Sequence, residues 1–399
     1  MCVTTSVVVT AAVNYTMPIA ENVVRKYNTL EIVVRDSVIK MNNSKLMPFL
    51  CMAVCSSMLI SLTSSCKKND WKRSLSFPVV DYTYRFPNQV ALTEGLVINL
   101  RTNDLLDVKN CKSIILISRE DHGEGYLTGF KKNTFETVGS FINKGNGPNE
   151  SINPVFFSDV VFEEESDQLY AYLYFRDKLH KINIYSSLDS NLLVVDDVYD
   201  TPNRLVCLKL HDNGYYTVSG YRDRSGFIRE LSNAKIKDYQ LLNDVHVSFR
   251  KDPNLVLFYS AYSESKELII EASLFLNTIN LYSTNGDRIK TICYGNRLES
   301  LAEKERLSEK GFLPKTFDGL RAYKNFFVCL YKGCMENYSH PHLLFFDYDG
   351  FPLIDVTIPS AVFSFDLDID NKVLYVIDDT IDSLVTYDIS SIVDTFLAS

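Results

Sequence analysis

The fold is decided by a repeated strand pair whose clearest copy reads HLLFFDYDGFPLIDVTI, residues 342–358. Two apolar runs flank Asp349 and Gly350, a dipeptide typical of tight turns between antiparallel strands. Another apolar run, at residues 324–331, precedes them. This unit predicts an antiparallel sheet of short strands joined by tight turns.

Similar groups of apolar, alternating runs recur along the chain, separated by Asn, Asp, Gly and Ser. The aromatic or leucine residue near the end of each third strand gives six marks, which are Phe130, Tyr185, Leu231, Tyr282, Phe346 and Tyr387. The marks are about forty to sixty-five residues apart, which matches the period of a propeller blade. Because one blade cannot bury both of its faces alone, blades stack in a closed ring. We therefore predict an all-β fold with a six-bladed β-propeller over residues 77–399.

A charged segment breaks the repeat between the fourth and fifth blades. Residues 296–310 carry Leu298, Leu301 and Leu307 at near-helical spacing, and a glycine follows as a stop signal. This pattern predicts a helical insertion near residues 296–311. A second irregularity, the acidic run Glu163-Glu164-Glu165, lies before a strand, and we interpret it as a solvated turn.

The two ends of the propeller predict how its ring closes. Little alternating pattern follows residue 389, so we expect the last blade to lack its outer strand. Residues 77–86 form an unassigned strand ahead of the first blade, with Val80, Tyr82, Tyr84 and Phe86 on one side. We predict that this strand pairs with the last blade and protects its edge. The alternative is that it only extends the tether.

An apolar segment ahead of the propeller predicts export. It begins with Lys45, continues through an uncharged run and the small residues 63–65, and ends at Cys66. This order resembles a bacterial lipoprotein signal, in which the cysteine takes a diacylglyceryl group after the signal is cut away. An uncleaved membrane anchor and a buried core helix are the alternatives. The polar residues that follow Cys66 favour the signal.

The lipoprotein interpretation divides the N-terminal part of the chain. The signal occupies residues 41–65, and a tether follows over residues 66–76. Residues 1–40 lie upstream of Met41, which we interpret as the true initiator. We therefore treat residues 1–40 as an over-extended gene start and expect no structure there.

The mature part, from Cys66 onward, is acidic. It holds 36 basic and 47 acidic residues, because 5 of the chain's 41 basic and 3 of its 50 acidic residues lie before Cys66. That balance argues against nucleic acid, which proteins bind by neutralising phosphates with Lys and Arg. It favours solubility outside the cell but does not identify a partner. We expect a monomer.

The mature part contains cysteines besides Cys66, namely Cys111, Cys207, Cys293, Cys329 and Cys334. Their spacing fits no zinc pattern, since only Cys329 and Cys334 lie near each other. A disulfide between these two is possible in an oxidising compartment. Buried free thiols in strands are the interpretation we prefer.

Candidates for catalytic or metal chemistry are few. His340 and His342 flank a proline, which disfavours regular strand pairing, and no carboxylate spacing completes a metal site. The Asp-rich runs at residues 366–370 and 378–382 lack the ligand register of a calcium loop. Residues 121–125 are interpreted as a hairpin turn, and the chain has no Gly-x-Ser-x-Gly elbow. The sequence therefore indicates no catalytic, cofactor-binding or metal-binding residue, and no cofactor.

One turn carries a resemblance to a known family. Its sequence is KGNGPNE, in which Gly145, Gly147, Pro148 and Glu150 form a structural turn motif. The glycines permit backbone angles closed to other residues, and the proline fixes the turn. No helix follows to make a phosphate cradle, so a nucleotide-binding interpretation is not favoured. Together with the signal, the motif resembles the TolB-like six-bladed propeller lipoproteins of Gram-negative gut anaerobes.

The resemblance implies architecture and location, and it transfers no activity. It implies a propeller held in the cell envelope by its lipid, at the outer membrane, on the periplasmic or the surface side. We predict a non-enzymatic binding or scaffolding protein whose funnel or rim holds a protein segment or a small-molecule ligand. The alternative is a hydrolase or lyase that acts on an exported carbohydrate or peptide at the propeller channel.

Overall fold

The computed structural model describes a strand pair within residues 29–42 and most of residues 80–397. Outside the description lie residues 1–28, 35–36, 43–79, 101, 121–122, 124, 148–149, 158–159, 166, 176–177, 201–205, 210–213, 224–225, 236–237, 248–254, 256, 285–286, 300, 312, 334–339 and 398–399. Between residues 200 and 254 the strands are described without their side chains. The chain forms two compact units, Met1–Leu75 and Ser76–Ser399.

The first unit contains one described strand pair. Strand β1 (Thr29–Val34) runs antiparallel to β2 (Ser37–Asn42), with Leu30 opposite Met41. Both strands are rich in β-branched residues, which suit a pleated surface. The pair departs from the expectation of no structure before residue 41, while the start at Met41 stays a prediction. The signal and Cys66 lie outside the described residues, and within the described part no helix is both long and apolar enough to cross a membrane.

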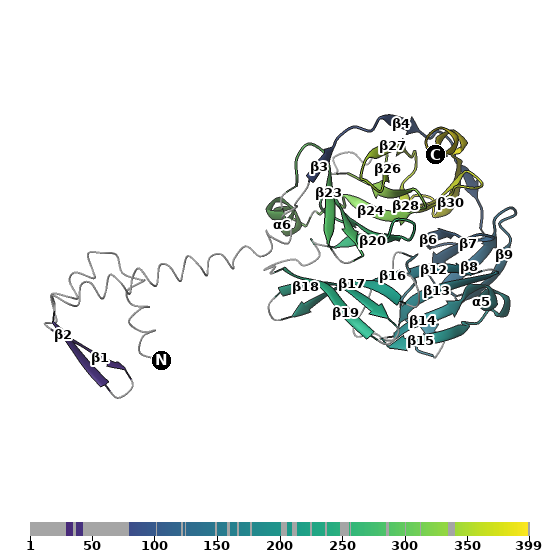
Figure 1. The fold of residues 1–399 in the computed structure, drawn as a ribbon. Coiled ribbons are helices and arrows are strands. Elements are labelled where there is room, and N and C mark those ends of the chain that lie inside the picture. Colours follow the sequence, from purple (N-terminus) through teal and green to yellow (C-terminus); the bar gives the residue numbers. More distant parts are fainter. Residues whose placement is uncertain are drawn as a thin grey trace. The chain divides into compact units, whose positions relative to one another are not determined.

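The second unit is all-β, and its antiparallel sheets are arranged as a β-propeller (Figure 1). The first sheet contains β6 (Leu105–Asn110), β7 (Ile114–Arg119), β8 (Leu127–Lys131) and β9 (Thr137–Phe141). The second sheet contains β12 (Val160–Glu165), β13 (Gln168–Phe175), β14 (Lys178–Asn183) and β15 (Val195–Asp200). Between these sheets lies a short parallel pair, β10 (Asn143–Lys144) and β11 (Glu150–Ser151). Helix α5 (Ile184–Ser190) connects β14 to β15.

The third sheet contains β16 (Val206–Lys209), β17 (Gly214–Asp223), β18 (Gly226–Lys235) and β19 (Asp238–Val247). The fourth sheet contains β20 (Phe258–Ser263), β21 (Leu268–Ser273), β22 (Thr278–Ser283) and β23 (Arg288–Tyr294). The fifth contains β24 (Phe317–Ala322), β25 (Phe326–Tyr331), β26 (His342–Asp347) and β27 (Pro352–Thr357). The sixth contains β28 (Val362–Asp368), β29 (Val373–Asp378) and β30 (Ser383–Asp388). Helix α6 (Leu301–Glu309) lies between β23 and β24, in the segment where the sequence predicts a helix, and α7 (Ser390–Ile392) and the π-helical turn η4 (Val393–Leu397) follow β30.

A belt of three short strands precedes the first sheet and adds to the outer edges of three others. Strand β3 (Val80–Thr83) runs parallel to β23, β4 (Asn88–Ala91) runs parallel to β27, and β5 (Leu96–Ile98) runs antiparallel to β30. We call residues 80–98 the belt; Figure 1 shows it passing from β3 to β4 along the outside of the propeller. The belt therefore pairs with the outer strands of the fourth, fifth and sixth sheets.

The belt corrects the predicted ring closure. Residues 77–86 were expected to pair with the last blade, but the part of this segment that forms β3 pairs with β23 of the fourth sheet. The sixth sheet does lack an outer strand from the C-terminal side, and β5 supplies it instead. The physical reason is reach, because the chain must pass the edges of two sheets before it arrives at β30. Closure by an N-terminal strand is thus correct, and the strand assigned to it is wrong.

The predicted number of blades is met in part. Five sheets have described side chains and stack as blades, whereas the third sheet is described by its strand pairing alone. Within that limit, β16 lies beside both β12 and β20, so the third sheet stands between the second and the fourth.

One predicted strand is partly wrong. The second group was expected to continue as a strand to Tyr185, but β14 ends at Asn183 and α5 begins at Ile184. The Asn183 side chain caps this helix by accepting a hydrogen bond from the backbone N–H of Ser186 at 3.0 Å. A helix of two turns is too short to show a clear apolar period, so its cap is the signal that the sequence offered.

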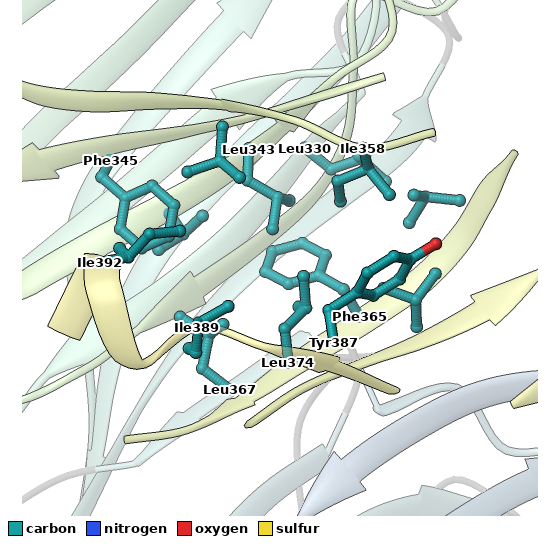
Figure 2. Close-up of a cluster of buried hydrophobic side chains, with 14 of the residues drawn as sticks. Leu330, Leu343, Phe345, Ile358, Phe365, Leu367, Leu374, Tyr387, Ile389 and Ile392 are labelled. Atoms are coloured by element: carbon teal, nitrogen blue, oxygen red, sulfur yellow. The ribbon is translucent and has the colours of Figure 1, made fainter. Parts of the chain in front are cut away.

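The hydrophobic core lies between neighbouring sheets, as stacked blades require. Figure 2 shows one such layer, in which Leu343 and Phe345 of the fifth sheet face Phe365 and Leu374 of the sixth. The C-terminal segment contributes Ile392 to the same cluster. The last residues of the chain therefore seal the end of this layer rather than adding a strand.

Candidate functional site

The first strand of each sheet lies at the middle of the propeller, where β6, β12, β16, β20, β24 and β28 surround one axis (Figure 1). Polar side chains of β6, of β28, and of β24 with the residue that follows it meet there. We call the following set the central network: Asp107, Lys109, Arg321, Tyr323, Ser364 and Asp366. It joins the first, fifth and sixth sheets.

Asp107 is the hub of this network and is buried. Its Oδ1 accepts a hydrogen bond from Nη2 of Arg321 at 2.9 Å and another from the hydroxyl of Ser364. Its Oδ2 accepts from the backbone N–H of Phe157 at 2.7 Å, just ahead of the second sheet. One carboxylate from β6 therefore binds groups from the fifth and sixth sheets and from the segment ahead of the second sheet.

Asp366 is the second buried carboxylate of the network. Its Oδ2 lies 3.0 Å from Nζ of Lys109, and its Oδ1 accepts from the hydroxyl of Tyr323 at 2.7 Å. Burial opposes ionisation of this group, but the charges of Lys109 and Arg321, with the Tyr323 hydroxyl, hold its pKa below the usual value. Asp366 therefore stays ionised at neutral pH.

The partners of these carboxylates are also fixed in their ordinary protonation states. Burial disfavours the charge of Arg321, but Asp107 and Asp366 outweigh it and raise the arginine pKa. Burial and the charge of Asp366 raise the pKa of Tyr323 well above its ordinary value. A general acid or base works best with a pKa near the operating pH. These three groups are held away from that range, so the central network is suited to joining blades.

A smaller polar group lies on β24 beside the network. The buried Asp318 accepts from the hydroxyl of Tyr259 at 2.9 Å, and Nζ of Lys315 and of Lys332 lie 2.7 Å and 2.5 Å from its carboxylate oxygens. Burial and the Asp318 charge raise the pKa of Tyr259. This group links the fourth and fifth sheets in the same manner.

Glu163 corrects the interpretation of the acidic run as a solvated turn. It belongs to the first strand of the second sheet, where the hydroxyl of Tyr172 donates to Oε2 at 2.6 Å. Nζ of Lys181 lies 3.6 Å from the same oxygen and 4.0 Å from the ring centroid of Tyr170. The strand β12 extends over residues that sequence composition assigned to a turn, because pairing with β13 outweighs their low strand propensity.

The histidine pair is divided between two environments. His340 is exposed, and His342 begins β26 with its Nδ1 at 2.7 Å from Oδ1 of the buried Asp355. The ring of His342 also lies against that of Tyr331, with centroids 6.3 Å apart. No group of three or more His, Cys, Asp or Glu residues suited to a metal occurs among the described residues.

The Asp-rich runs hold the sixth sheet to the first. Asp382 accepts from the backbone N–H groups of Asp104 and Leu105, at 2.5 Å and 2.9 Å. Asp368 accepts from Nζ of Lys132 at 2.7 Å. Both runs belong to the sixth sheet, and their carboxylates bind residues at the two ends of the first sheet's strands β6 and β8.

The turn motif folds its own glutamate back over its glycines. Oε2 of Glu150 accepts from the backbone N–H of Gly147 at 2.6 Å, and the N–H of Gly145 donates to the carbonyl of Ser151 at 2.9 Å. A Cβ at Gly145 would lie 2.0 Å from that carboxylate oxygen, and one at Gly147 would lie 2.8 Å from it. The glycines are needed because the carboxylate occupies the space a side chain would take; Pro148 lies outside the described residues.

Among the cysteines whose side chains are described, Cys111, Cys293 and Cys329 are buried and lie outside any disulfide. Burial raises the pKa of Cys329, and burial with the Glu299 charge raises that of Cys293 to about 11. A thiol with a raised pKa is a weak nucleophile at neutral pH. Cys207 and Cys334 lie where side chains are not described.

The sequence held a signal for the central network that motif searching missed. Asp107 and Lys109 are two residues apart, as are Ser364 and Asp366, so each pair lies on one face of its strand. Polar residues at alternate positions of the first strand in a blade indicate that these strands present polar side chains to a common axis. Which sheets pair across that axis is set only by the closed ring.

No family model and no curated protein matches this chain. Among solved structures, it is similar to a member of the DUF4221 family from Bacteroides vulgatus, with 9% identity, a TM-score of 0.44, and coverage of 74% of this chain and 96% of that chain. A protein of unknown function from Bacteroides thetaiotaomicron is 9% identical, with a TM-score of 0.42 and coverage of 76% of this chain and 75% of that chain. Raptor from Chaetomium thermophilum is 11% identical, with a TM-score of 0.43 and coverage of 77% of this chain and 29% of that chain. At these TM-scores the likenesses support no conclusion, and the propeller arrangement rests on the strand pairing of this chain.

Proposed function

We propose that this protein is a binding or scaffolding β-propeller without enzymatic activity. The observation that carries the proposal is the central network, in which Arg321 pairs with Asp107 at 2.9 Å and Lys109 with Asp366 at 3.0 Å, while Arg321 and Asp366 stay charged. Ionised groups fixed in this way stabilise a rigid support, and binding residues are commonly carried on loops that such a support positions. The rim then holds a protein segment or a small-molecule ligand.

The test uses purified protein that begins at Lys67, with metal analysis and a panel of carbohydrate and peptide substrates. We expect no stoichiometric metal and no turnover above the rate of a heat-denatured sample. Turnover that disappears in the His342→Gln variant but persists in His340→Gln would favour the hydrolase or lyase alternative, since His342 is held by Asp355 whereas His340 is exposed.

We further propose that the protein is exported and anchored by lipid at Cys66, in the outer membrane. The support is the order of residues 45–66, in which a basic start, an apolar run and small residues precede the cysteine. The Cys66→Ala variant should accumulate as unprocessed precursor or leave the detergent phase. Identical fractionation of parent and variant would exclude the lipid anchor.

The six-bladed ring of a TolB-like lipoprotein is part of the same proposal. Its support is the position of β16 beside β12 and β20, which gives the third sheet the place of a blade. A crystal structure of the domain tests the number of blades. A ring with the fourth sheet packed directly on the second would contradict it.

A further inference from the structure

The belt's first strand and the residue that follows it display two exposed tyrosines, Tyr82 in β3 and Tyr84 just after it. Tyr82 is 50% exposed and Tyr84 is 64% exposed. The guanidinium carbon of Arg85 lies 5.7 Å from the ring centroid of Tyr84. Each tyrosine has an apolar ring and a polar tip, a combination enriched where proteins meet membrane interfaces.

The inward side of the same segment is firmly attached to the fourth and fifth sheets. Asp81 lies 2.8 Å from Nζ of Lys290, and the carbonyl of Thr83 accepts from the N–H of Gly295 at 2.7 Å. Phe86 is buried with its ring centroid 5.2 Å from that of Phe346. Because these contacts fix the strand, the exposure of Tyr82 and Tyr84 is a property of the fold and not of a loose end.

Chain length limits the distance between this strand and the proposed lipid. Fourteen residue steps separate Cys66 from Val80, so the two are at most about 50 Å apart even when the chain is fully extended. The sequence between them contains Trp71, the single tryptophan of the chain, and four basic residues against one acidic residue. Basic residues near a membrane anchor are attracted to anionic lipid, and tryptophan favours the interface.

The segment between Cys66 and Val80 is basic, whereas the mature protein as a whole is acidic. An anionic surface therefore attracts the tether and repels the bulk of the propeller, which favours one orientation. We infer that Tyr82, Tyr84 and Arg85 form a membrane-facing edge that contacts the lipid interface. This inference rests on the lipid anchor at Cys66 and adds the side of the propeller that meets the bilayer.

The experiment places a fluorescent probe at chosen positions of the acylated full chain. Tyr84→Cys is labelled with an environment-sensitive dye, and the protein is reconstituted in vesicles of phosphatidylcholine and phosphatidylglycerol that carry a spin-labelled quencher lipid. Leu192→Cys and Leu96→Cys are matched controls, because these residues are 61% and 67% exposed but lie away from β3, Leu192 just after α5 and Leu96 on the sixth sheet. Unsubstituted protein treated with dye gives the background from the native cysteines.

We expect quenching at position 84 to be several-fold greater than at positions 96 and 192. Tyr82→Cys, two residues earlier in the belt, provides an independent position and should behave like Tyr84→Cys. Equal quenching at all positions, or more at the controls, would overturn the inference while leaving the anchor intact. Failure of the unsubstituted protein to remain with the vesicles would instead refute the lipid anchor and the inference with it. Each variant is checked by its melting curve before reconstitution.

Discussion

The belted half and the unbelted half of the propeller protect their sheet edges differently. In the fourth, fifth and sixth sheets, β3, β4 and β5 cover the outer strands with backbone pairing. In the first sheet, α5 packs on β9, where Asn191 accepts from the backbone N–H of Ser140 at 3.0 Å. In the second sheet, β15 ends the sheet and carries the exposed acidic residues Asp196 and Asp197.

The difference shows that one requirement has several physical solutions. An open edge strand is a template for aggregation, and pairing, covering and charge each reduce that hazard. The belt does more than cover edges, because β5 completes the sixth sheet. The belted half therefore depends on a segment that is distant in sequence, whereas the unbelted half depends on local residues.

Removing the whole belt should have the largest effect on this comparison. A chain that begins at Asn99 lacks β3, β4 and β5, so it exposes three outer strands and leaves the sixth sheet with three strands. We expect aggregation or loss of a cooperative melting transition. A chain that begins at Asn88 keeps β4 and β5 and should melt cooperatively at a lower temperature than one that begins at Ser76. Equal melting of the Asn88 and Asn99 chains would show that β5 does not close the ring.

Arg321→Met should break the seam between the two halves. It leaves Asp107 on the unbelted side and Asp366 on the belted side buried without this cation. Removing one partner of a buried ion pair costs about 3–5 kcal/mol of unfolding free energy, measurable by urea denaturation. The matched control is Lys131→Met, whose exposed partner is Glu136 at 2.9 Å, and it should leave the midpoint unchanged. Similar midpoints for both variants would show that the central network does not hold the seam.

Phe86→Ala tests the side chain that fixes the belt. Phe86 is 7% exposed and packs against Tyr294 and Phe346. Truncating a buried phenylalanine to alanine typically lowers the unfolding free energy by about 3–5 kcal/mol. Because Phe86 lies at the outer edge of the propeller, we expect a loss at the lower end of that range. The exposed Phe351→Ala is the control. An unchanged denaturation midpoint for Phe86→Ala would mean that backbone pairing alone holds the belt.

Acid should weaken the seam through Asp366. Burial alone would raise its pKa, but Lys109 and then Arg321 outweigh burial, so the folded-state pKa lies below the unfolded value. The ionised Asp366 therefore contributes to the unfolding free energy at pH values above its unfolded-state pKa of about 3.9. That contribution is lost as the pH falls through its lower folded-state pKa. Unfolding free energy should decline below about pH 4, and Asp366→Asn should flatten that decline. A parallel pH profile for this variant would contradict the assignment.

Asn183→Ala should have the smallest effect and should be confined to the unbelted half. The side chain caps α5, and loss of such a cap costs about 1 kcal/mol. Amide exchange in β9 should rise, because α5 covers that strand, while exchange in β27 should stay as it is. An equal rise in both strands would indicate global rather than local loosening.

Local pattern was enough to predict the antiparallel sheets of a β-propeller. Alternating apolar runs and turn residues identified the third strands that contain Phe130, Tyr282, Phe346 and Tyr387. The same pattern failed at Tyr185, where capping by Asn183 starts a short helix. It also failed at Glu163, because the edge of a strand depends on its partner as well as on its own residues.

The sequence alone determined an all-β chain and the period of its strands. It also placed polar residues at alternate positions of β6 and β28, a signal that motif searching missed. Only the tertiary structure decided that Asp107 meets Arg321, more than two hundred positions away, and that β5 rather than residues 77–86 completes the sixth sheet. Strand pattern is a property of neighbouring residues, since side chains alternate with the backbone pleat. Partners across a closed ring depend on how many sheets stand between them, and that geometry exists only after the ring has formed.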